Sequence, residues 1–447
     1  MKYLIFTFAL VFGVPIGAIL MRQSKLVERI LLALLLLAPA ADITINFMSH
    51  EWYRGDTRGI EFDLTDIVAL TMLLGMAISS RFRKIRLAPT GSVPFAIFLL
   101  FLFLSIANAY VPLYGFFTLS RILRGFMLYV VLYNYLRNAP ERIEFTFKIL
   151  AVAILWQTIR VLEQKYMMGI YRATGTFPHP NTLSLYAEMI VPLLLAAVLH
   201  KKQKPQALFW FAILGGMLCV LSTFSRAGIV ILGGAIFMSI LLSLWQKQTS
   251  RKVLIIVLFC MIGIAGAIKA SDSIIERFLK APKSSEESRN NFNAAAHAMA
   301  EEKIFGVGLN NYPYALKNTE YAAYINYVEA EAGVCHHIYW LYAGETGYLG
   351  LASFLLFIGS FYLKALRFSV KRRPDLYRAA GLGILASYTA LHLHGFTEWV
   401  FRQSAILYLF FTLSAILIVC IEISRGRRKN RQTESGNIPG DAADGLQ

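Results

Sequence analysis

Two adjacent histidines, His336 and His337, close the one long polar stretch of the chain, which runs over residues 269–338. Imidazole titrates near neutral pH and is the usual general base when a hydroxyl must lose a proton. Adjacent residues on a helix point about 100° apart, so at most one of the two faces a given site. Zinc ligands on a helix prefer a spacing of about three or four residues, so this pair does not indicate a metal site. A loop of this length favours a functional cap over a connector.

Charged residues at the edges of apolar runs are the second chemical signal. Arg226 lies in a short turn between two apolar segments, where an unpaired guanidinium costs about 2–3 kcal/mol or more at depth, so an anionic partner is expected. Arg289 lies within the polar stretch. Glu345 follows the histidines and either pairs with a cation or orients one of them. A further polar cluster, for which structural hydrogen bonding is an equal alternative, comprises His392, His394, Glu398 and Arg402.

Apolar segments must position these residues. With 447 residues, 57% apolar side chains and a mean hydropathy of +0.54, the chain exceeds the apolar content of soluble domains. We expect an all-α, polytopic integral membrane protein with about 12–13 transmembrane helices. The apolar runs lie near residues 3–21, 27–43, 66–80, 93–112, 122–136, 145–162, 183–199, 206–224, 227–246, 253–268, 345–366, 379–396 and 404–424.

The net charge of +17 is concentrated in every second loop and in the tail. This is the positive-inside pattern of a membrane protein, and it argues against a nucleic-acid partner, for which clustered cations neutralise phosphates. It orients the C-terminus toward the cytoplasm and the polar stretch outward. We expect a first transmembrane part over 1–268, a loop domain over 269–338, a second transmembrane part over 339–424 and a disordered cytoplasmic tail over 425–447. The four cysteines imply no disulfide framework.

The order of several motifs resembles the O-antigen ligase and O-antigen polymerase superfamily. The family pattern of a histidine, a short apolar run and then E-x-G-x-x-G is matched from His336 to Gly350, although His337 stands where Asn is commoner. Four further motifs occur in the same order, at Gly175–Asn181, Ser225–Gly228, Ser288–Arg289 and Phe305–Asn310. The resemblance covers most of the chain from about residue 110 to residue 410.

The resemblance implies an inverting, metal-independent glycosyltransferase of the bacterial inner membrane that needs no cofactor. Its donor is a glycan on polyprenyl pyrophosphate, presented in the bilayer at the periplasmic face. The acceptor is a sugar hydroxyl, on lipid A-core in ligases and on another lipid-linked repeat unit in polymerases. Polysaccharide assembly proteins are further candidate partners.

The resemblance also suggests roles for residues of this chain. His336 is the expected base, with His337 as the alternative, because a sugar hydroxyl is a poor nucleophile. Arg226 and Arg289 are expected to bind the pyrophosphate, because guanidinium forks suit phosphate oxygens. Secondary candidates for glycan or pyrophosphate binding are Arg121, Arg124, Arg172 and Glu398.

Two other classes of protein share the composition. A transporter or flippase of lipid-linked saccharides also has many spans and intramembrane arginines, but transporters often contain internal repeats, which this sequence lacks. A structural subunit of an envelope assembly would use the loop for docking. The motifs do not separate ligation from polymerisation, and they do not name the sugar.

Overall fold

The computed structural model describes residues 2–41, 44–82, 84–139, 141–200, 207–257, 260–261, 283–325, 333–371 and 375–436. The expected all-α architecture is confirmed over this part of the chain, where the strands β1 (Thr44–Asn46) and β2 (Glu61–Asp63) form one small antiparallel hairpin. The helices of the first half are α1 (Lys2–Phe8), η1 (Ala9–Gly13), α2 (Val14–Gln23), α3 (Lys25–Leu37), η2 (Ala38–Ala40), α4 (Leu64–Ile78), α5 (Ser92–Ala107), α6 (Pro112–Leu136), α7 (Glu141–Leu162), η3 (Glu163–Met167), α8 (Pro180–His200) and α9 (Ala207–Ser222). The second half contains α10 (Arg226–Gln246), α12 (Lys283–Glu302), α13 (Tyr312–Asn318), η4 (Glu320–Tyr324), α15 (Ile338–Ser369), α16 (Leu376–His394), η5 (Val400–Arg402) and α17 (Ser404–Gly436).

The number of full-length spans differs from the expectation. A helix lies at the position of every expected span except 253–268, most of which is outside the described residues. By length and composition, seven described helices can cross a membrane, and α4, α5 and α9 are apolar but shorter. A helix rises about 1.5 Å per residue, so these three fall short of the roughly 30 Å of a hydrocarbon core. The expected count of about thirteen therefore included apolar helices too short to span alone.

The C-terminal helix also extends further than expected. α17 continues to Gly436, into the segment expected to be a disordered tail. This extension contains several Arg, Lys and Gln residues, which are good helix formers. Residues 437–447 lie outside the described part of the chain.

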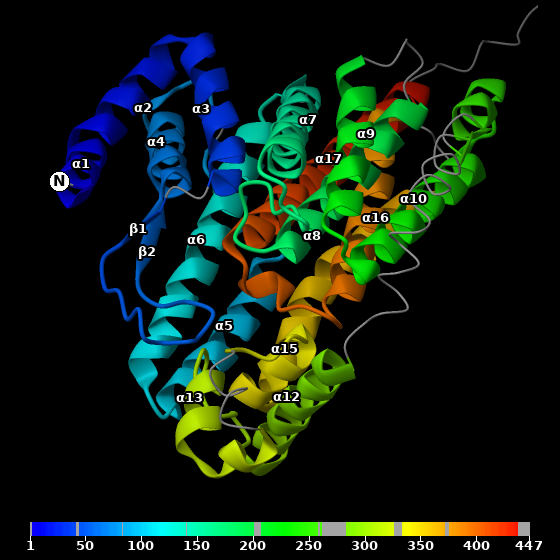
Figure 1. Ribbon diagram of the computed structural model, residues 1–447. Helices are drawn as coiled ribbons and strands as arrows, with labels where there is room; N and C mark the ends of the chain where they lie inside the picture. The colour runs from blue at the N-terminus through cyan, green and yellow to red at the C-terminus, as the bar shows by residue number, and fades with distance from the viewer. Residues whose placement is uncertain are drawn as a thin grey trace, which may run out of the picture.

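The helix α8 lies at the centre of the bundle. Its apolar window is completely buried, and α8 packs closely against α9, α10 and α16. Figure 1 shows α6, α8, α16 and α17 inside the bundle, with α1 and α10 at its margins. A helix that is apolar all round is typical of such a central position.

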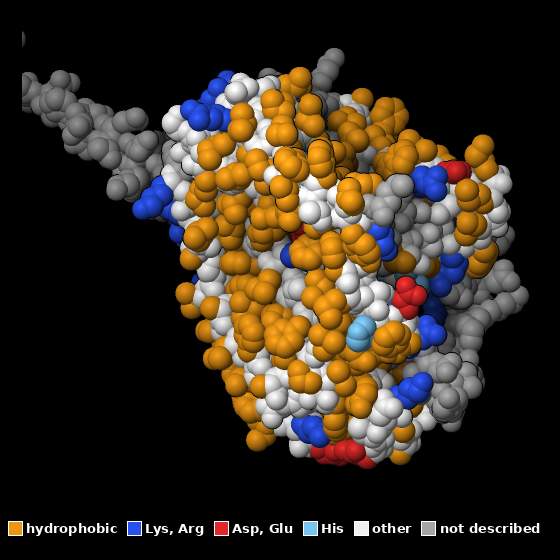
Figure 2. Space-filling model, turned by 90° about the vertical axis from the view of Figure 1, so that its left-hand side faces the viewer, with side chains coloured by type: hydrophobic (Ala, Val, Ile, Leu, Met, Phe, Trp, Pro, Cys, Tyr) orange, Lys and Arg blue, Asp and Glu red, His pale blue; other side chains and the backbone are white. Residues whose placement is uncertain are grey.

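The outer surface of the bundle is apolar, as a membrane requires. Large hydrophobic side chains are exposed along α1, α2, α10 and α15. Figure 2 shows one such face, which hydrophobic side chains cover for the most part. An exposed apolar area of this extent marks a surface that contacts lipid or another apolar partner.

The two ends of the bundle differ in character. At one end, which we call the cap end, α12 and α13 cover the start of α15 (Figure 1). The opposite end, which we call the basic end, carries most of the Lys and Arg residues, including Arg22, Arg86, Arg137, Arg378 and Arg425. Residues 269–282 and 326–332 of the expected loop domain lie outside the described residues.

A break in α15 holds the cap in place. Gly347 has φ 70° and ψ 173° within this helix, a conformation that is open essentially to glycine alone. The carbonyl oxygens of Gly344 and Glu345 accept hydrogen bonds from the amides of Val307 and Gly308, at 2.9 and 3.0 Å. The glycine-rich segment after α12 thus pairs with helix carbonyls that a break leaves available.

We predict that Gly347→Ala destabilises the protein. A Cβ atom at residue 347 would lie 1.9 Å from the carbonyl oxygen of Ile304, and the backbone strain alone costs about 1–3 kcal/mol. The thermal unfolding midpoint of the purified protein in detergent should therefore fall.

Gly234→Ala is the matched control. A Cβ atom there meets nothing within 4 Å, and alanine favours a helix by about 0.5–1 kcal/mol over glycine. An unfolding midpoint for Gly347→Ala that equals that of Gly234→Ala would contradict the role of the break.

Candidate active site

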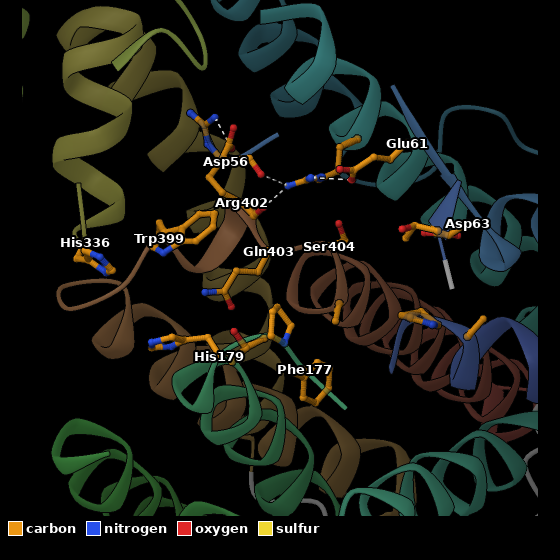
Figure 3. A pocket seen from close by; sticks show the side chains of 17 residues that line it. Asp56, Glu61, Asp63, Phe177, His179, His336, Trp399, Arg402, Gln403 and Ser404 are labelled. Carbon is orange, nitrogen blue, oxygen red and sulfur yellow. Dashed lines mark hydrogen bonds and ion pairs between the residues drawn. The ribbon is translucent and has the colours of Figure 1, made fainter. Parts of the chain in front are cut away.

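A cavity of about 360 Å³ lies where the segments before α8, before α15 and between α16 and α17 meet. Its wall combines charged and aromatic side chains from the β1–β2 hairpin, α6, the turn before α8 and the segment between α16 and α17. Figure 3 shows His179 and His336 on one side of this cavity and Asp56, Glu61 and Arg402 on another. A concave, partly apolar pocket with a few convergent polar groups is the usual form of a ligand site.

His336 is held by a chain of hydrogen bonds. Its Nδ1 lies 3.3 Å from Oε2 of the buried Glu398, and the side-chain amide of Asn181 donates to the other oxygen of Glu398. Arg172 donates from Nη2 to Oδ1 of Asn181 at 3.2 Å and from Nε to the carbonyl oxygen of Thr223 at 3.0 Å. This series of hydrogen bonds therefore orients the ring of His336 from its Nδ1 side.

Backbone contacts bring these residues together from distant parts of the sequence. The amide of Ile338, the first residue of α15, donates to the carbonyl oxygen of Gly395, just after α16, at 2.9 Å. This contact places the residue before α15 against the segment that carries Glu398. Asn181 stands at the start of α8, and its backbone amide donates to Nδ1 of His179 at 3.2 Å.

The electrostatics of the site favour an ionised carboxylate at Glu398 and the neutral forms of His179 and His337. Burial alone would raise the pKa of Glu398, but the hydrogen bond and charge of His336, with the bond from Asn181, lower it to about 2. Burial lowers the pKa of His179, and the charges of Arg172 and Arg289 lower it further, against the opposing effect of Glu398. Burial also lowers the pKa of His337. Opposite charges and hydrogen bonds favour the charged form, whereas burial disfavours it.

The two adjacent histidines point into different cavities, as the sequence predicted that only one would face a given site. His337 caps α15, because its Nδ1 accepts from the amide of Trp340 at 3.2 Å. Its ring lies among Tyr339, Trp340 and Phe396. His336, in contrast, lines the polar cavity beside Glu398.

An apolar groove of about 760 Å³ begins at His337 and runs between α15 and α16. Its wall is almost entirely hydrophobic, and it includes Leu351, Leu355 and Leu393. Leu393 is half exposed, so the groove opens on the outer, lipid-facing surface of the bundle. An apolar groove therefore lies directly beside the polar cavity.

Arg289 belongs to α12, and Arg226 is the first residue of α10. The positive charge of Arg289 acts on both His179 and His394, so this arginine lies on the same side of the bundle as His336. Arg226 is exposed at the first turn of α10. Two residues later, Gly228 packs so closely on Ser184 of α8 that a Cβ would lie 1.9 Å from its hydroxyl oxygen.

A second buried pair lies beneath Asn181. His394 of α16 bonds through Nδ1 to Glu188 of α8 at 2.9 Å, and Ser184 donates to the same carboxylate at 2.7 Å. Both members of the pair are almost completely buried. This pair joins α8 to α16 under the site, and the sequence had placed only His394 in a polar cluster.

Three further arginines of the region are paired with carboxylates. Arg402 donates to Asp56 at 2.9 Å and to Glu345 at 2.5 Å, so Glu345 pairs with a cation rather than with a histidine. Arg121 pairs with Glu61 at 3.0 Å. Arg124 donates to Asp66 at 2.6 Å, within the box of carboxylates that caps α4.

Each of the secondary candidates has a partner within the protein. Arg121 and Arg124 have their charges compensated by acids, and Arg172 and Glu398 belong to the chain that holds His336. Asn181, Asp56 and Glu61 were not among the expected site residues. Asn181 had a signal in the sequence, because it ends the Gly175–Asn181 motif, whereas the two acids had none. Among the residues that the structure describes, no three His, Cys, Asp or Glu side chains are grouped so as to hold a metal ion.

The comparison with family models adds independent support. Residues 207–355 match the model described as O-antigen ligase. The matched range includes Arg226, Arg289, the glycine-rich segment and His336. No curated protein matches the chain. The match covers about a third of the chain, and over these residues it confirms the predicted resemblance to the O-antigen ligase and polymerase superfamily.

Proposed function

We propose that this protein transfers a glycan from polyprenyl pyrophosphate to a sugar hydroxyl, with His336 as the general base. The observation that carries the proposal is the contact between His336 and the buried Glu398 at the wall of an open polar cavity. A base that is oriented by a third group beside an accessible cavity is the arrangement expected for activation of a hydroxyl.

The protonation of Glu398 determines which nitrogen of His336 acts. A carboxyl whose pKa is about 2 is ionised at neutral pH and can only accept a hydrogen bond,. Nδ1 of His336 must therefore carry the proton that it shares with Glu398. In the neutral ring, Nε2 is then the free acceptor.

The reaction follows from this tautomer. Nε2 takes the proton of the acceptor hydroxyl as its oxygen forms a bond to the anomeric carbon of the donor. The bond from that carbon to the pyrophosphate oxygen breaks, and polyprenyl pyrophosphate leaves with the electron pair. Attack opposite to the leaving group inverts the anomeric centre. Glu398 stays ionised and stabilises the imidazolium that forms.

We expect the leaving group to be stabilised by arginines that do not belong to the series of hydrogen bonds that holds His336. Departure places concentrated negative charge on the pyrophosphate, and guanidinium groups are always protonated and match phosphate oxygens. The charge of Arg289 acts on His179, and Arg226 begins α10, which packs against α8. Arg121, Arg124 and Arg402, in contrast, are compensated by acids. We therefore assign the pyrophosphate to Arg289 and Arg226.

The groove between α15 and α16 suits the polyprenyl chain. It begins at His337, one residue from the proposed base, and its wall is apolar. Burial of isoprenoid carbons in such a groove is favourable by about 25 cal/mol per Å² of apolar surface removed from water. The positive-inside pattern supports an outward-facing cap end, so we assign this transfer to the outer face of the inner membrane.

A reconstituted assay would show whether the acceptor is a lipid A-core or another repeat unit. Purified protein is incubated with lipid-linked repeat units, with and without a lipid A-core acceptor. Ladders of product without the second lipid identify a polymerase, and product that needs it identifies a ligase. No transfer under either condition would contradict the proposed function.

We predict that His336→Ala lowers kcat by about 10²–10⁴-fold, the range that a general base contributes. Glu398→Gln should lower kcat with little change in KM, because it removes the charge that orients the ring and stabilises the imidazolium. In the His336→Ala background, Glu398→Gln should cause little further loss, since coupled residues are not additive. Additive losses would show that Glu398 acts independently of His336.

We predict that Arg289→Ala and Arg226→Ala each reduce kcat/KM by about 10- to 100-fold, the equivalent of a lost charge-assisted hydrogen bond. Lys should restore only part of the rate, because it lacks the planar fork. Arg58→Ala, an exposed arginine of the β1–β2 loop, is the control. Wild-type rates for both site variants would exclude the pyrophosphate assignment.

We predict that Leu363→Trp, which narrows the apolar groove at the end far from His337, raises KM for donors with a full-length polyprenyl chain. Donors that carry the same glycan on a short prenyl chain should be used at the wild-type rate, because their chain ends before the substitution. Transfer assays with both donors measure the difference. An equal loss for the two donors would mean that the groove does not hold the polyprenyl chain.

A further inference from the structure

A second cavity, of about 540 Å³, lies at the basic end of the bundle and is separate from the proposed active site. It is formed by the end of α15, the start of α16 and the basic part of α17. Its polar wall carries the cations Lys364, Arg367, Lys371, Arg378 and Arg425. No carboxylate is among the described residues that line it.

Most of this positive charge has no compensating carboxylate among the residues that the structure describes. Arg378 lies 3.7 Å from Asp375, its acidic neighbour at the cap of α16. The described residues offer no carboxylate within ion-pair distance of Lys364, Arg367 or Arg425, and the charges of the two arginines repel that of Lys364. Like charges gathered in a confined space raise the free energy of the protein unless an anion joins them. The cavity therefore favours an anionic occupant.

The remaining wall of the cavity is apolar and opens toward lipid. Leu355 and Leu356 line it and are about half exposed, at 44% and 50%. The hydroxyl of Ser424, also in the wall, is buried without a hydrogen-bond partner among the described residues. A buried hydroxyl of this kind stands ready to donate to an incoming acceptor. An occupant must hence combine anionic oxygens with hydrocarbon.

We propose that this cavity binds the headgroup of an anionic phospholipid from the leaflet at the basic end. The phosphate would lie among Lys364, Arg367 and Arg425, with the hydroxyl of Ser424 donating to it. The acyl chains would run along Leu355 and Leu356. Basic pockets between transmembrane helices on the cytoplasmic side recognise anionic headgroups by this combination of contacts.

The proposal does not depend on the transfer reaction. The cavity lies at the opposite end of α15 from His336, and the cations of its wall are absent from the active-site cavity. The apolar groove beside His337 does share Leu355, Gly359 and Leu363 with it. Variants that test the lipid site should therefore avoid these three positions.

The test compares lipids that differ only in headgroup charge. The full-length protein in detergent is titrated with phosphatidylglycerol or with phosphatidylcholine of the same acyl chains, and bound lipid is counted by native mass spectrometry. We expect phosphatidylglycerol to bind more tightly. The triple variant Lys364→Gln, Arg367→Gln and Arg425→Gln should weaken that binding by roughly a hundredfold, since each cation near anionic lipid contributes about a fivefold factor.

Two controls separate the site from general attraction of charge. Arg81→Gln with Lys84→Gln removes exposed cations elsewhere at the basic end and should leave the binding unchanged. Leu356→Trp keeps every cation but obstructs the apolar wall, so it should weaken binding of the lipid and not of inorganic phosphate. Equal binding of the two lipids, an equal loss in the surface control, or phosphate competing as well as the lipid would each overturn the proposal.

Discussion

One buried guanidinium organises the cap end of the molecule. Arg402 joins the hairpin loop through Asp56 and α15 through Glu345, while its own carbonyl oxygen accepts from Arg121 of α6 at 2.5 Å. Removal of one member of such a network leaves an uncompensated buried charge, which costs about 3–5 kcal/mol. The segment between α16 and α17 carries both Arg402 and Glu398, so the network that fixes the floor of the cavity also sets the position of the carboxylate beside His336.

Compensation of charge divides the arginines of this region into two kinds. Arg121, Arg124 and Arg402 have carboxylates of their own, and their role in the fold is to join segments far apart in the sequence. Arg226 and Arg289 have no carboxylate partner among the described residues. An arginine whose charge is already satisfied has little to offer an anionic substrate, whereas an uncompensated one gains from binding it. We therefore rank the arginine candidates for pyrophosphate binding by whether their charge is compensated, and not by position alone.

The sequence predicted the class of fold, and it pointed to several residues that the structure places at the candidate site, but not to their arrangement. Apolar runs report helices reliably, so every expected span in the described chain has one, while the short runs at α4, α5 and α9 were counted as full spans. The motif order located His336, Arg226 and Arg289. It could not reveal that Glu398 holds His336 through an oriented carboxylate, because the two lie far apart in the chain and meet only when α15 and α16 pack. Likewise, the sequence did not reveal that Glu61 pairs with Arg121 and that Asp66 pairs with Arg124.

The opposite directions of His336 and His337 have a consequence for any amphiphile that binds here. Neighbouring Cα atoms are about 3.8 Å apart, yet the first ring belongs to a water-accessible cavity and the second to a hydrophobic groove. The boundary between the two environments is therefore about one peptide unit wide. A molecule that occupies both must place the junction of its polar head and its apolar tail at this peptide. The position of one peptide group thus determines how deeply such a ligand is bound and how far its tail extends along the groove.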